Sequence, residues 1–249
     1  MSLLRLNNVS VKKRLYAFSE EIHYGERIHI IGANGAGKST LLMAISGDLR
    51  FDGDIVLNGI SIKHYKYRDL SRMQSIVVQQ INALPFMPVF QYLLLYHSLS
   101  AMNNIRLNEL LKDFQVDNLL TKNVQHLSGG EWQRVRIVAA LIQVWSSDQL
   151  NGKLLLLDEP TNNLDIVQLA ILDKWLDKFC QQGGAVIMST HDLHHSYIKA
   201  HKIWLMLEGK LINSGSSTFL LNENLLSLIF NAKIRCIKSS KSINWHVFT

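Results

Sequence analysis

The sequence has few cysteines, few prolines and no long apolar run. Its only cysteines, Cys180 and Cys236, are too few for a disulfide framework and fit a reducing compartment. Three prolines in 249 residues exclude a proline-rich linker or repeat protein. The longest apolar stretches, at 92–99 and 154–157, are far shorter than the roughly 20 residues that cross a bilayer. The first residues also lack the apolar core and cleavage site of a secretory leader. We therefore expect a chain on the cytoplasmic side, which acts at a membrane only through a partner.

What remains is the composition of a compact globular protein. Hydrophobic residues make up 47% and charged residues 18% of the chain, which allows one large core, or one main domain with an attached subdomain. Lysine and arginine outnumber the acidic residues by 26 to 20, giving a net charge of +6. Such a surface tolerates nucleotides, nucleic acid or lipid head groups, although a modest positive balance is more often an ordinary solvated surface.

Apolar periodicity predicts an α/β fold with a mixed sheet. Residues 3–11 and 26–32 read as strands, and the second strand runs into a glycine-rich turn and then a helix that ends at Gly47. The continuous apolar runs at 153–160 and 184–190 are typical of parallel strands that are covered on both faces. Asn58-Gly59 and Gly209 mark two hairpins, and apolar residues recur at helical spacing between about 88 and 145. We predict a single domain over 1–249, with a catalytic core and antiparallel β subdomain from 1–84 and 146–249, and an inserted helical subdomain at 85–145.

A phosphate-binding loop lies between the second strand and its helix. The stretch GANGAGKS fits G-x-x-x-x-G-K-[ST] with Gly32, Gly37, Lys38 and Ser39 at the fixed positions. Glycines let backbone amides converge on phosphates, and the helix presents the positive end of its dipole to them. Lys38 would reach the terminal phosphates, and the Ser39 hydroxyl a magnesium ion. The expected nucleotide-binding residues are Gly32, Ala33, Asn34, Gly35, Ala36, Gly37, Lys38, Ser39 and Thr40.

Asp158 and Glu159 end the apolar run LLLL and add the second half of a phosphoryl-transfer site. Asp158 would help to hold magnesium, and Glu159 would act as general base or position the attacking water. Gln79, at the end of another strand, would contact the metal and sense the γ-phosphate. His191, directly after AVIMST, is a candidate donor to that phosphate. We therefore expect Glu159, His191 and Gln79 to be catalytic, and Ser39, Gln79 and Asp158 to surround Mg2+.

A second anion-binding turn lies in LSGGEWQR at 127–134. Ser128 and the amides of Gly129 and Gly130 stand at the start of a helix, where backbone donors are free for an anion. The helical insertion places this turn at the far end of a subdomain, away from the phosphate loop. Two copies arranged head to tail resolve the geometry, because each lends its turn to the nucleotide of the other. We expect a homodimer that closes when ATP fills it.

With these motifs in this order, the chain resembles the nucleotide-binding subunits of ATP-binding cassette (ABC) transporters over essentially its whole length. The LSGG signature about ninety residues after a phosphate loop is highly specific for them. The resemblance implies the P-loop NTPase fold of ABC ATPases, and an ATPase that is peripheral on the cytoplasmic face of the inner membrane and drives a separate permease. It also identifies Asn162 to Asp165, NNLD, as the loop that links the two sites of the dimer, with Asp165 communicating between them.

Within that family, LSGGEWQRVR, LLLLDEP and CQQGGAVIMSTHDLHH are most similar to the ATPase subunits of cobalamin (vitamin B12) importers. This likeness implies cobalamin uptake, with a periplasmic substrate-binding protein acting indirectly. The segment 79–97 would contact the permease, because Pro85, Phe86, Met87 and Pro88 offer an apolar surface beside Gln79.

Two other functions are compatible with these motifs. The same ATPase could serve an iron-siderophore or haem importer, although the segment after Gln79 lacks the Gly-Arg pair that iron-chelate importers tend to carry. A soluble ABC protein acting on nucleic acid or ribosomes would explain the basic run at 63–68, but such proteins usually carry two cassettes or a long coiled-coil insertion, so we expect no nucleic-acid partner.

The sequence differs from the family pattern at the site of the base. The family usually stacks an aromatic residue on adenine, whereas Lys12, Lys13 and Arg14 stand near that place and Tyr16 is out of register. A cation over the ring, or loose base recognition, is the expectation.

Overall fold

The structure is a computed structural model that describes residues 2–79, 84–97, 102–145, 149–238 and 243–248, and of residues 238, 243 and 244 only the backbone. Its strands are β1 (Ser2–Val11), β2 (Leu15–His23), β3 (Arg27–Ile31), β4 (Asp52–Leu57), β5 (Ile60–Ser61), β6 (Gln74–Val77), β7 (Leu154–Asp158), β8 (Ala185–Ser189), β9 (Lys202–Leu207), β10 (Lys210–Gly215), β11 (Lys233–Lys238) and β12 (Ile243–Phe248). Its α-helices are α1 (Lys38–Ser46), α2 (Tyr67–Met73), α3 (Val89–His97), α4 (Asn104–Asp113), α5 (Gly129–Val144), α6 (Ile166–Gln181), α7 (Leu193–Lys199), α8 (Ser217–Leu220) and α9 (Glu223–Phe230).

The central sheet brings the predicted motifs to one edge. Its strand order is β10-β9-β3-β8-β7-β6, with β10 antiparallel to β9 and the other neighbours parallel. Parallel strands end on the same edge of a sheet, so the segments after β3, β6, β7 and β8 meet there. Those segments contain the phosphate loop, Gln79, Asp158 with Glu159, and His191.

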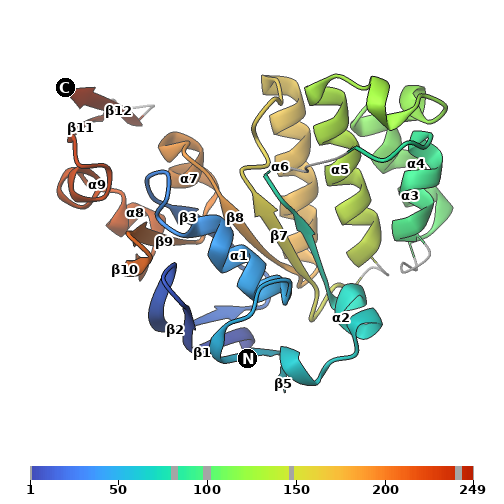
Figure 1. The fold of residues 1–249 in the computed structure, drawn as a ribbon. Helices are drawn as coiled ribbons and strands as arrows, with labels where there is room; N and C mark the ends of the chain where they lie inside the picture. Colours follow the sequence, from blue (N-terminus) through green and yellow to red (C-terminus); the bar gives the residue numbers. More distant parts are fainter. Residues whose placement is uncertain (1, 80–83, 98–101, 146–148, 239–242, 249) are drawn as a thin grey trace.

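A separate antiparallel sheet, of order β2-β1-β4-β5, lies beside α1 (Figure 1). The hairpin predicted at Asn58-Gly59 forms, and both residues adopt the positive φ that such a tight turn requires. Strand β2 was not expected. Its turn, at residues 12–14, contains no glycine, and Lys13 takes the left-handed conformation instead, at φ 64°. Turns are predicted from residues such as glycine, asparagine and proline, so a turn with lysine at its left-handed position is not predicted from the sequence.

Strand β7 separates two hydrophobic cores. Leu154 and Leu156 pack into the core that contains α1 and the antiparallel sheet, whereas Leu155 and Leu157 pack into the core that contains α3, α5 and α6. All four side chains are fully buried, and burial of a leucine contributes about 1.5–3 kcal/mol. This explains why the run is continuously apolar, and it fixes the position of Asp158 at the end of the strand.

Helix α5 continues directly from the LSGG turn, and most of its 16 residues are buried. Ser128 accepts a hydrogen bond from the amide of Glu131, and Glu131 accepts one from the amide of Ser128, so a reciprocal capping box begins the helix. From Val138 to Leu141 every residue is buried, as expected of a helix inside a core. Because α3 and α5 share their core with β7 and β8, the division into core and helical subdomain stays a proposal.

The C-terminal part covers the β9 side of the central sheet. Helix α9 and strand β11 bury Leu226, Ile229 and Ile234 against Ile31 and Leu205 of the sheet. β11 pairs with β12 in an antiparallel register. Within the described ranges no helix combines the length and the apolar content that a membrane span needs.

Candidate functional site

The phosphate loop joins β3 to α1 in the conformation that the motif requires. Gly35 and Gly37 have φ values of 81° and 100°, which residues with a side chain rarely adopt. A Cβ on Gly32 would collide with the carbonyl of Met206 on the neighbouring strand, so this glycine lets the loop lie against β9. Gly37 precedes the first turn of α1, whose amides have no partners within the helix and are therefore available to an anion.

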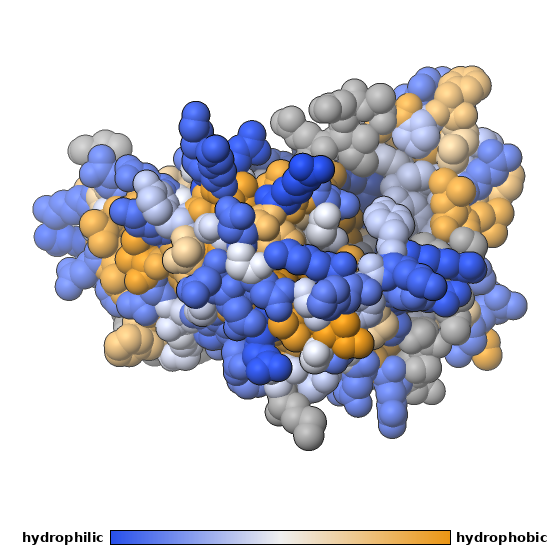
Figure 2. Space-filling model, turned by 60° about the horizontal axis from the view of Figure 1, so that its bottom comes forward, coloured by the Kyte–Doolittle hydropathy of each residue, from blue (hydrophilic) through white to orange (hydrophobic). Residues whose placement is uncertain are grey.

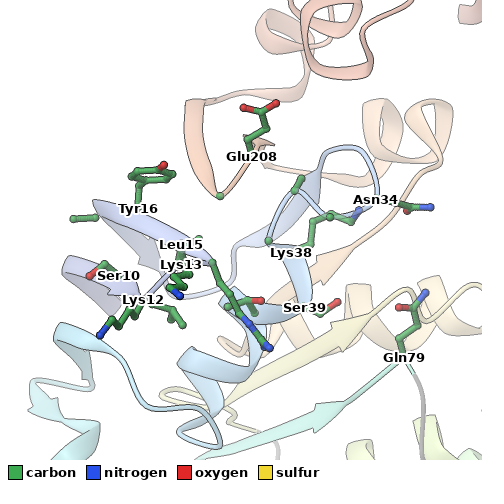
Figure 3. Close-up of a pocket in the computed structure, with 18 of the residues that line it drawn as sticks. Ser10, Lys12, Lys13, Leu15, Tyr16, Asn34, Lys38, Ser39, Gln79 and Glu208 are labelled. Carbon is green, nitrogen blue, oxygen red and sulfur yellow. The ribbon is translucent and has the colours of Figure 1, made fainter.

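A cavity of about 1060 Å³ opens over this loop. It is lined by residues 10–17 and 34–40, with Gln79, Glu159, Glu208 and Gly209 completing the wall (Figure 3). Ligand cavities for small molecules typically measure 300–1,000 Å³, so a nucleoside triphosphate fits this space. Of the predicted nucleotide-binding residues, 34–40 line the cavity, whereas Gly32 and Ala33 lie beneath it and hold the loop.

The Lys38 side chain is held inside the loop by hydrogen bonds. Its Nζ donates hydrogen bonds to the carbonyls of Gly32, at 2.8 Å, and Ala33, at 3.2 Å. Burial lowers the pKa of its ammonium group, while the nearby carboxylates of Glu159 and Asp158 act in the opposite direction. The side chain is thus fixed next to the cavity rather than extended into solvent, with only 6% of it exposed.

Glu159 is the point where the predicted catalytic side chains meet. Its Oε2 accepts hydrogen bonds from Gln79 Nε2, at 2.7 Å, and from Asn162 Nδ2, at 2.8 Å. Its Oε1 lies 2.7 Å from His191 Nε2. The backbone of Glu159 is left-handed, at φ 48°, which turns the chain sharply after the strand. The segments after β6 and β8, together with Asn162 three residues further along the chain, therefore hold one carboxylate at the wall of the cavity.

Asp158 faces inward and is held by Ser189. The Ser189 hydroxyl donates to Asp158 Oδ1, at 2.5 Å, and accepts a hydrogen bond from the amide of Glu159, at 2.9 Å. Asp158 and Ser189 are paired in the register of β7 and β8. No sequence motif contains Ser189 as a functional residue. A serine at the end of a strand is too common to be singled out before the pairing of β7 and β8 is known.

The LSGG turn lies away from this cavity. Ser128, Gly129 and Gly130 are not among the residues that line it. The turn instead packs on the NNLD loop: a Cβ on Gly130 would stand 2.9 Å from the backbone oxygen of Asn163. In that loop Asp165 caps α6 by accepting a hydrogen bond from the amide of Gln168. The two motifs are neighbours in one chain, and the LSGG turn does not form part of the cavity wall of that chain.

The far end of the cavity is lined by cations. Lys12, Lys13 and Arg14 form the β1–β2 turn beside the phosphate loop, and no carboxylate in the described part of the chain pairs with them. Tyr16 is among the lining residues but is 61% exposed, and in Figure 3 it points away from Lys12 and Lys13. Lys210 Nζ lies 4.9 Å from its ring centroid.

Comparison with known proteins agrees with this geometry. A family model described as ABC transporter matches residues 15–162. The chain belongs to the ABC transporter family, and within it to the ATP-binding, ATP-hydrolysing components. The family inferred from the motifs is thereby confirmed.

Particular relatives match almost the whole chain. It is 47% identical over 247 residues to the Vitamin B12 import ATP-binding protein BtuD of Photorhabdus laumondii, covering 99% of this chain and 98% of that protein. It is 42% identical over 249 residues to the protein of the same name from Yersinia enterocolitica, covering 98% of each.

Solved structures confirm the predicted fold. The structure of an ATP-binding subunit of an ABC transporter has a TM-score of 0.76 at 23% identity, over 86% of this chain and 90% of that one. An ATP-binding cassette in its ADP conformation has a TM-score of 0.74 at 21% identity, over 93% of this chain and 99% of that one. At these identities the likeness concerns the fold alone.

Proposed function

We propose that this chain is the ATPase subunit of a cobalamin (vitamin B12) importer, peripheral on the cytoplasmic face of the inner membrane. The observation that supports the cargo is the 47% identity, over 99% of the chain, to a protein named for vitamin B12 import. The observation that supports hydrolysis is the carboxylate of Glu159, held by Gln79, Asn162 and His191 at the wall of the cavity.

The residues at the sheet edge fit a triphosphate with a magnesium ion. The amides of residues 34–40 and the Lys38 ammonium would hold the phosphates. Gln79 Nε2 is turned to Glu159, so its amide oxygen is the atom left for a cation. With the Ser39 hydroxyl and the Asp158 carboxylate it makes an all-oxygen donor set, which magnesium prefers. When bound, the ion would offset negative charge on the phosphates.

Hydrolysis requires a water molecule to attack the γ-phosphorus while the bond to the β-phosphate oxygen breaks, giving ADP and phosphate. Glu159 positions that water and accepts its proton. Lys38 and His191 donate hydrogen bonds to the γ-phosphate and offset the charge that develops on it. Gln79 and Asn162 keep the Glu159 carboxylate in place, so little reorganisation is needed at the moment of reaction.

The working unit is a head-to-tail homodimer. Ser128, Gly129 and Gly130 lie outside the cavity of their own chain, which supports their use by a second copy. Each nucleotide would then be bound between the phosphate loop of one protomer and the LSGG turn of the other. The contact between Gly130 and Asn163 supports a role for the NNLD loop, with Asp165, in communicating the closure of one site to the other.

Helix α3 is the proposed contact with the permease. Phe86, Phe90, Leu94 and Leu95 are between 42% and 79% exposed, and Figure 2 shows apolar side chains at the right of the view, on the side where Figure 1 places α3 and α4. Of the predicted segment 79–97, residues 80–83 lie outside the described part. An exposed apolar surface next to the Gln79 segment suits a short helix of a membrane subunit.

The base of the nucleotide lies against the β1–β2 turn. With Tyr16 engaged by Lys210, the side chains of residues 12–14 supply cations that can lie over a purine ring. This mode of binding does not read the exocyclic groups of the base, so it distinguishes ATP from GTP weakly.

The cargo is tested by co-purification and reconstitution. The chain should co-purify with a membrane permease, and ATP hydrolysis by the reconstituted complex should rise when a periplasmic binding protein loaded with cobalamin is added. A binding protein loaded with an iron siderophore or haem serves as the matched control. Stimulation by the iron-loaded protein and not by the cobalamin-loaded one would refute the proposed cargo while leaving the ATPase assignment intact.

A further inference from the structure

We propose that Gln133 and Arg136 are positioning residues that tie the LSGG helix, α5, to the two loops carrying Gln79 and Glu159. The proposal rests on the catalytic role of Glu159 put forward above. It concerns two side chains that do not reach the cavity and that none of the sequence motifs explains.

The two side chains form a continuous set of hydrogen bonds. Gln133 Nε2 donates to the carbonyl of Pro160 at 2.9 Å, and Arg136 Nη2 donates to the carbonyl of Val78. Arg136 Nη1 donates to Gln133 Oε1 at 3.1 Å, which joins the two contacts to each other. Val78 directly precedes Gln79, and Pro160 directly follows Glu159. Each contact therefore fixes the backbone next to a side chain of the catalytic group.

Arg136 is poorly suited to a purely stabilising role. Only 7% of it is exposed, and the hydrogen bonds of its guanidinium go to a backbone carbonyl and a side-chain amide oxygen. Burial lowers the pKa of its guanidinium. A buried charge that contacts only neutral acceptors carries a desolvation cost that an apolar side chain of similar size would avoid. The guanidinium instead fixes the relative position of two groups, because its planar fork of donors contacts the Val78 carbonyl and the Gln133 side chain at the same time.

Because Gln133 and Arg136 lie on the helix that begins at the LSGG turn, their contacts connect that turn to the two catalytic loops. Ser128 begins the helix, and Gln133 and Arg136 lie five and eight residues further on, roughly 8 to 12 Å along a rigid helix. The Gln79–Glu159 hydrogen bond of 2.7 Å depends on loops whose displacement by about 1 Å can cost 10²-fold in rate. When the LSGG turn engages the nucleotide of the partner, α5 therefore sets the separation of Gln79 and Glu159.

The same helix offers a matched control. Gln143 Nε2 donates to the carbonyls of Ser71, at 2.7 Å, and Gln74, at 3.1 Å. It joins α5 to α2 and to the beginning of β6, away from both catalytic loops. Gln133 and Gln143 thus make the same kind of contact, a side-chain amide to a backbone carbonyl, at opposite ends of one helix.

The test compares Arg136→Met, Gln133→Met and Gln143→Met in the full-length chain. We expect Arg136→Met and Gln133→Met to lower kcat for ATP at least tenfold, with KM for ATP within about threefold and a melting temperature no more affected than in Gln143→Met. Gln143→Met should retain its kcat. Arg136→Lys should recover part of the activity, because one donor can still reach Val78. An unchanged kcat in folded Arg136→Met and Gln133→Met overturns the proposal.

A double variant separates a positioning role from a general loss of structure. In a Glu159→Gln background, Arg136→Met should reduce turnover by less than threefold further, since both changes act on the same group. A full tenfold further loss would show that Arg136 acts elsewhere and would overturn the proposal. If Glu159→Gln alone keeps full turnover, the proposed catalytic role fails first. If it is inactive and Arg136→Met is normal, only the positioning role fails.

Discussion

Gln79 and Glu159 are eighty positions apart in the chain, yet the amide Nε2 of the first donates a 2.7 Å hydrogen bond to the carboxylate of the second. The sheet explains the contact. β6 and β7 run parallel, with Val77 opposite Leu157, so residues two positions further on leave the sheet side by side. This pair links the end of one strand to the end of the next at the wall of the nucleotide cavity.

Replacement of Glu159 should abolish turnover and spare binding. Glu159→Gln keeps the shape of the side chain and can still contact its neighbours, but it cannot accept a proton from water. We expect ATP hydrolysis to fall by about 10²- to 10⁴-fold while ATP still binds, which would hold the dimer closed. Phosphate release and gel filtration with ATP measure the two effects. Normal phosphate release by this variant would remove Glu159 from the mechanism.

Much of this site could be predicted from sequence because its residues stand directly after strongly apolar strands. The run before Asp158 and the glycines before Lys38 determine where those side chains must emerge. Ser189 and Asn162 could not be found in the same way, since a serine at a strand end or an asparagine in a turn has no pattern of its own. Their roles depend on which strands become neighbours, and that is decided by the whole sheet.

The β1–β2 turn shows the same limit for the fold. This turn contains no glycine, and no sequence pattern predicts the left-handed backbone that Lys13 adopts. The strand that follows the turn is therefore not predicted, whereas the family resemblance does place Lys12 to Arg14 near the base, and these residues line the cavity.

Gly130→Ala should destabilise the protein although alanine normally favours a helix. The new Cβ would stand 2.9 Å from the backbone oxygen of Asn163, whereas at Gly129 the nearest atom is 3.9 Å away. Overpacking of this kind costs about 1–3 kcal/mol, which outweighs the roughly 1 kcal/mol gained from helix propensity. Urea unfolding of the two alanine variants measures the difference. Equal stability of Gly130→Ala and Gly129→Ala would contradict the contact between the LSGG turn and the NNLD loop.

Acid should destabilise the fold, partly through His29. Burial, together with the charge of Arg27, lowers the pKa of His29 well below its usual value. His29 therefore stays neutral in the folded state, while the unfolded chain binds a proton as the pH falls through about 6.5. The free energy of unfolding should decrease from about pH 7 to about pH 5. His29→Asn, which keeps a polar atom for Ser196, should show a smaller decrease, and an equal decrease would exclude His29 as a source.

Asp173 should contribute to the loss of stability at lower pH than His29. Burial would raise the pKa of its carboxyl, but the hydrogen bond from His195 and the charge of Arg27 together lower it to about 2. Its folded pKa is below its unfolded value, so its contribution is present above about pH 4 and is lost as the pH falls towards 2. Asp173→Asn should flatten this part of a circular-dichroism acid titration. A titration of the same shape as that of the native chain would refute the assignment.

Cations in the β1–β2 turn should set nucleotide affinity. A cation over an aromatic ring contributes about 0.5–2 kcal/mol, so Arg14→Gln and Lys13→Gln should each raise the dissociation constant of ATP by about 2- to 30-fold. Affinities for ATP and GTP should remain within about tenfold of each other. Lys63→Gln, a cation outside the cavity wall, is the control. Strong preference for ATP, retained in both variants, would require another contact with the base.

Removal of the apolar surface formed by α3 and the segment before it should uncouple transport from hydrolysis. Phe86→Ser and Phe90→Ser alter side chains that are 79% and 42% exposed, so folding and basal ATP hydrolysis should be kept. Cobalamin uptake by the reconstituted importer should fall at least tenfold. Phe219→Ser, at a 72% exposed position on α8, should transport normally. Full uptake with both the Phe86 and the Phe90 variant would place the permease contact elsewhere.

The shared nucleotide site is tested most directly by a crosslink between two different chains. One chain carries Ser128→Cys and Lys38→Ala, so it presents a thiol but cannot hold ATP, and the other has native Ser128 and Lys38 with Glu159→Gln to keep the dimer closed. An ATP analogue with a thiol-reactive γ-substituent is added, and labelled peptides are mapped. We predict label at position 128 of the first chain only when the second chain is present. If position 128 of the first chain stays unlabelled although the second chain is present and has bound the analogue, the head-to-tail dimer is contradicted.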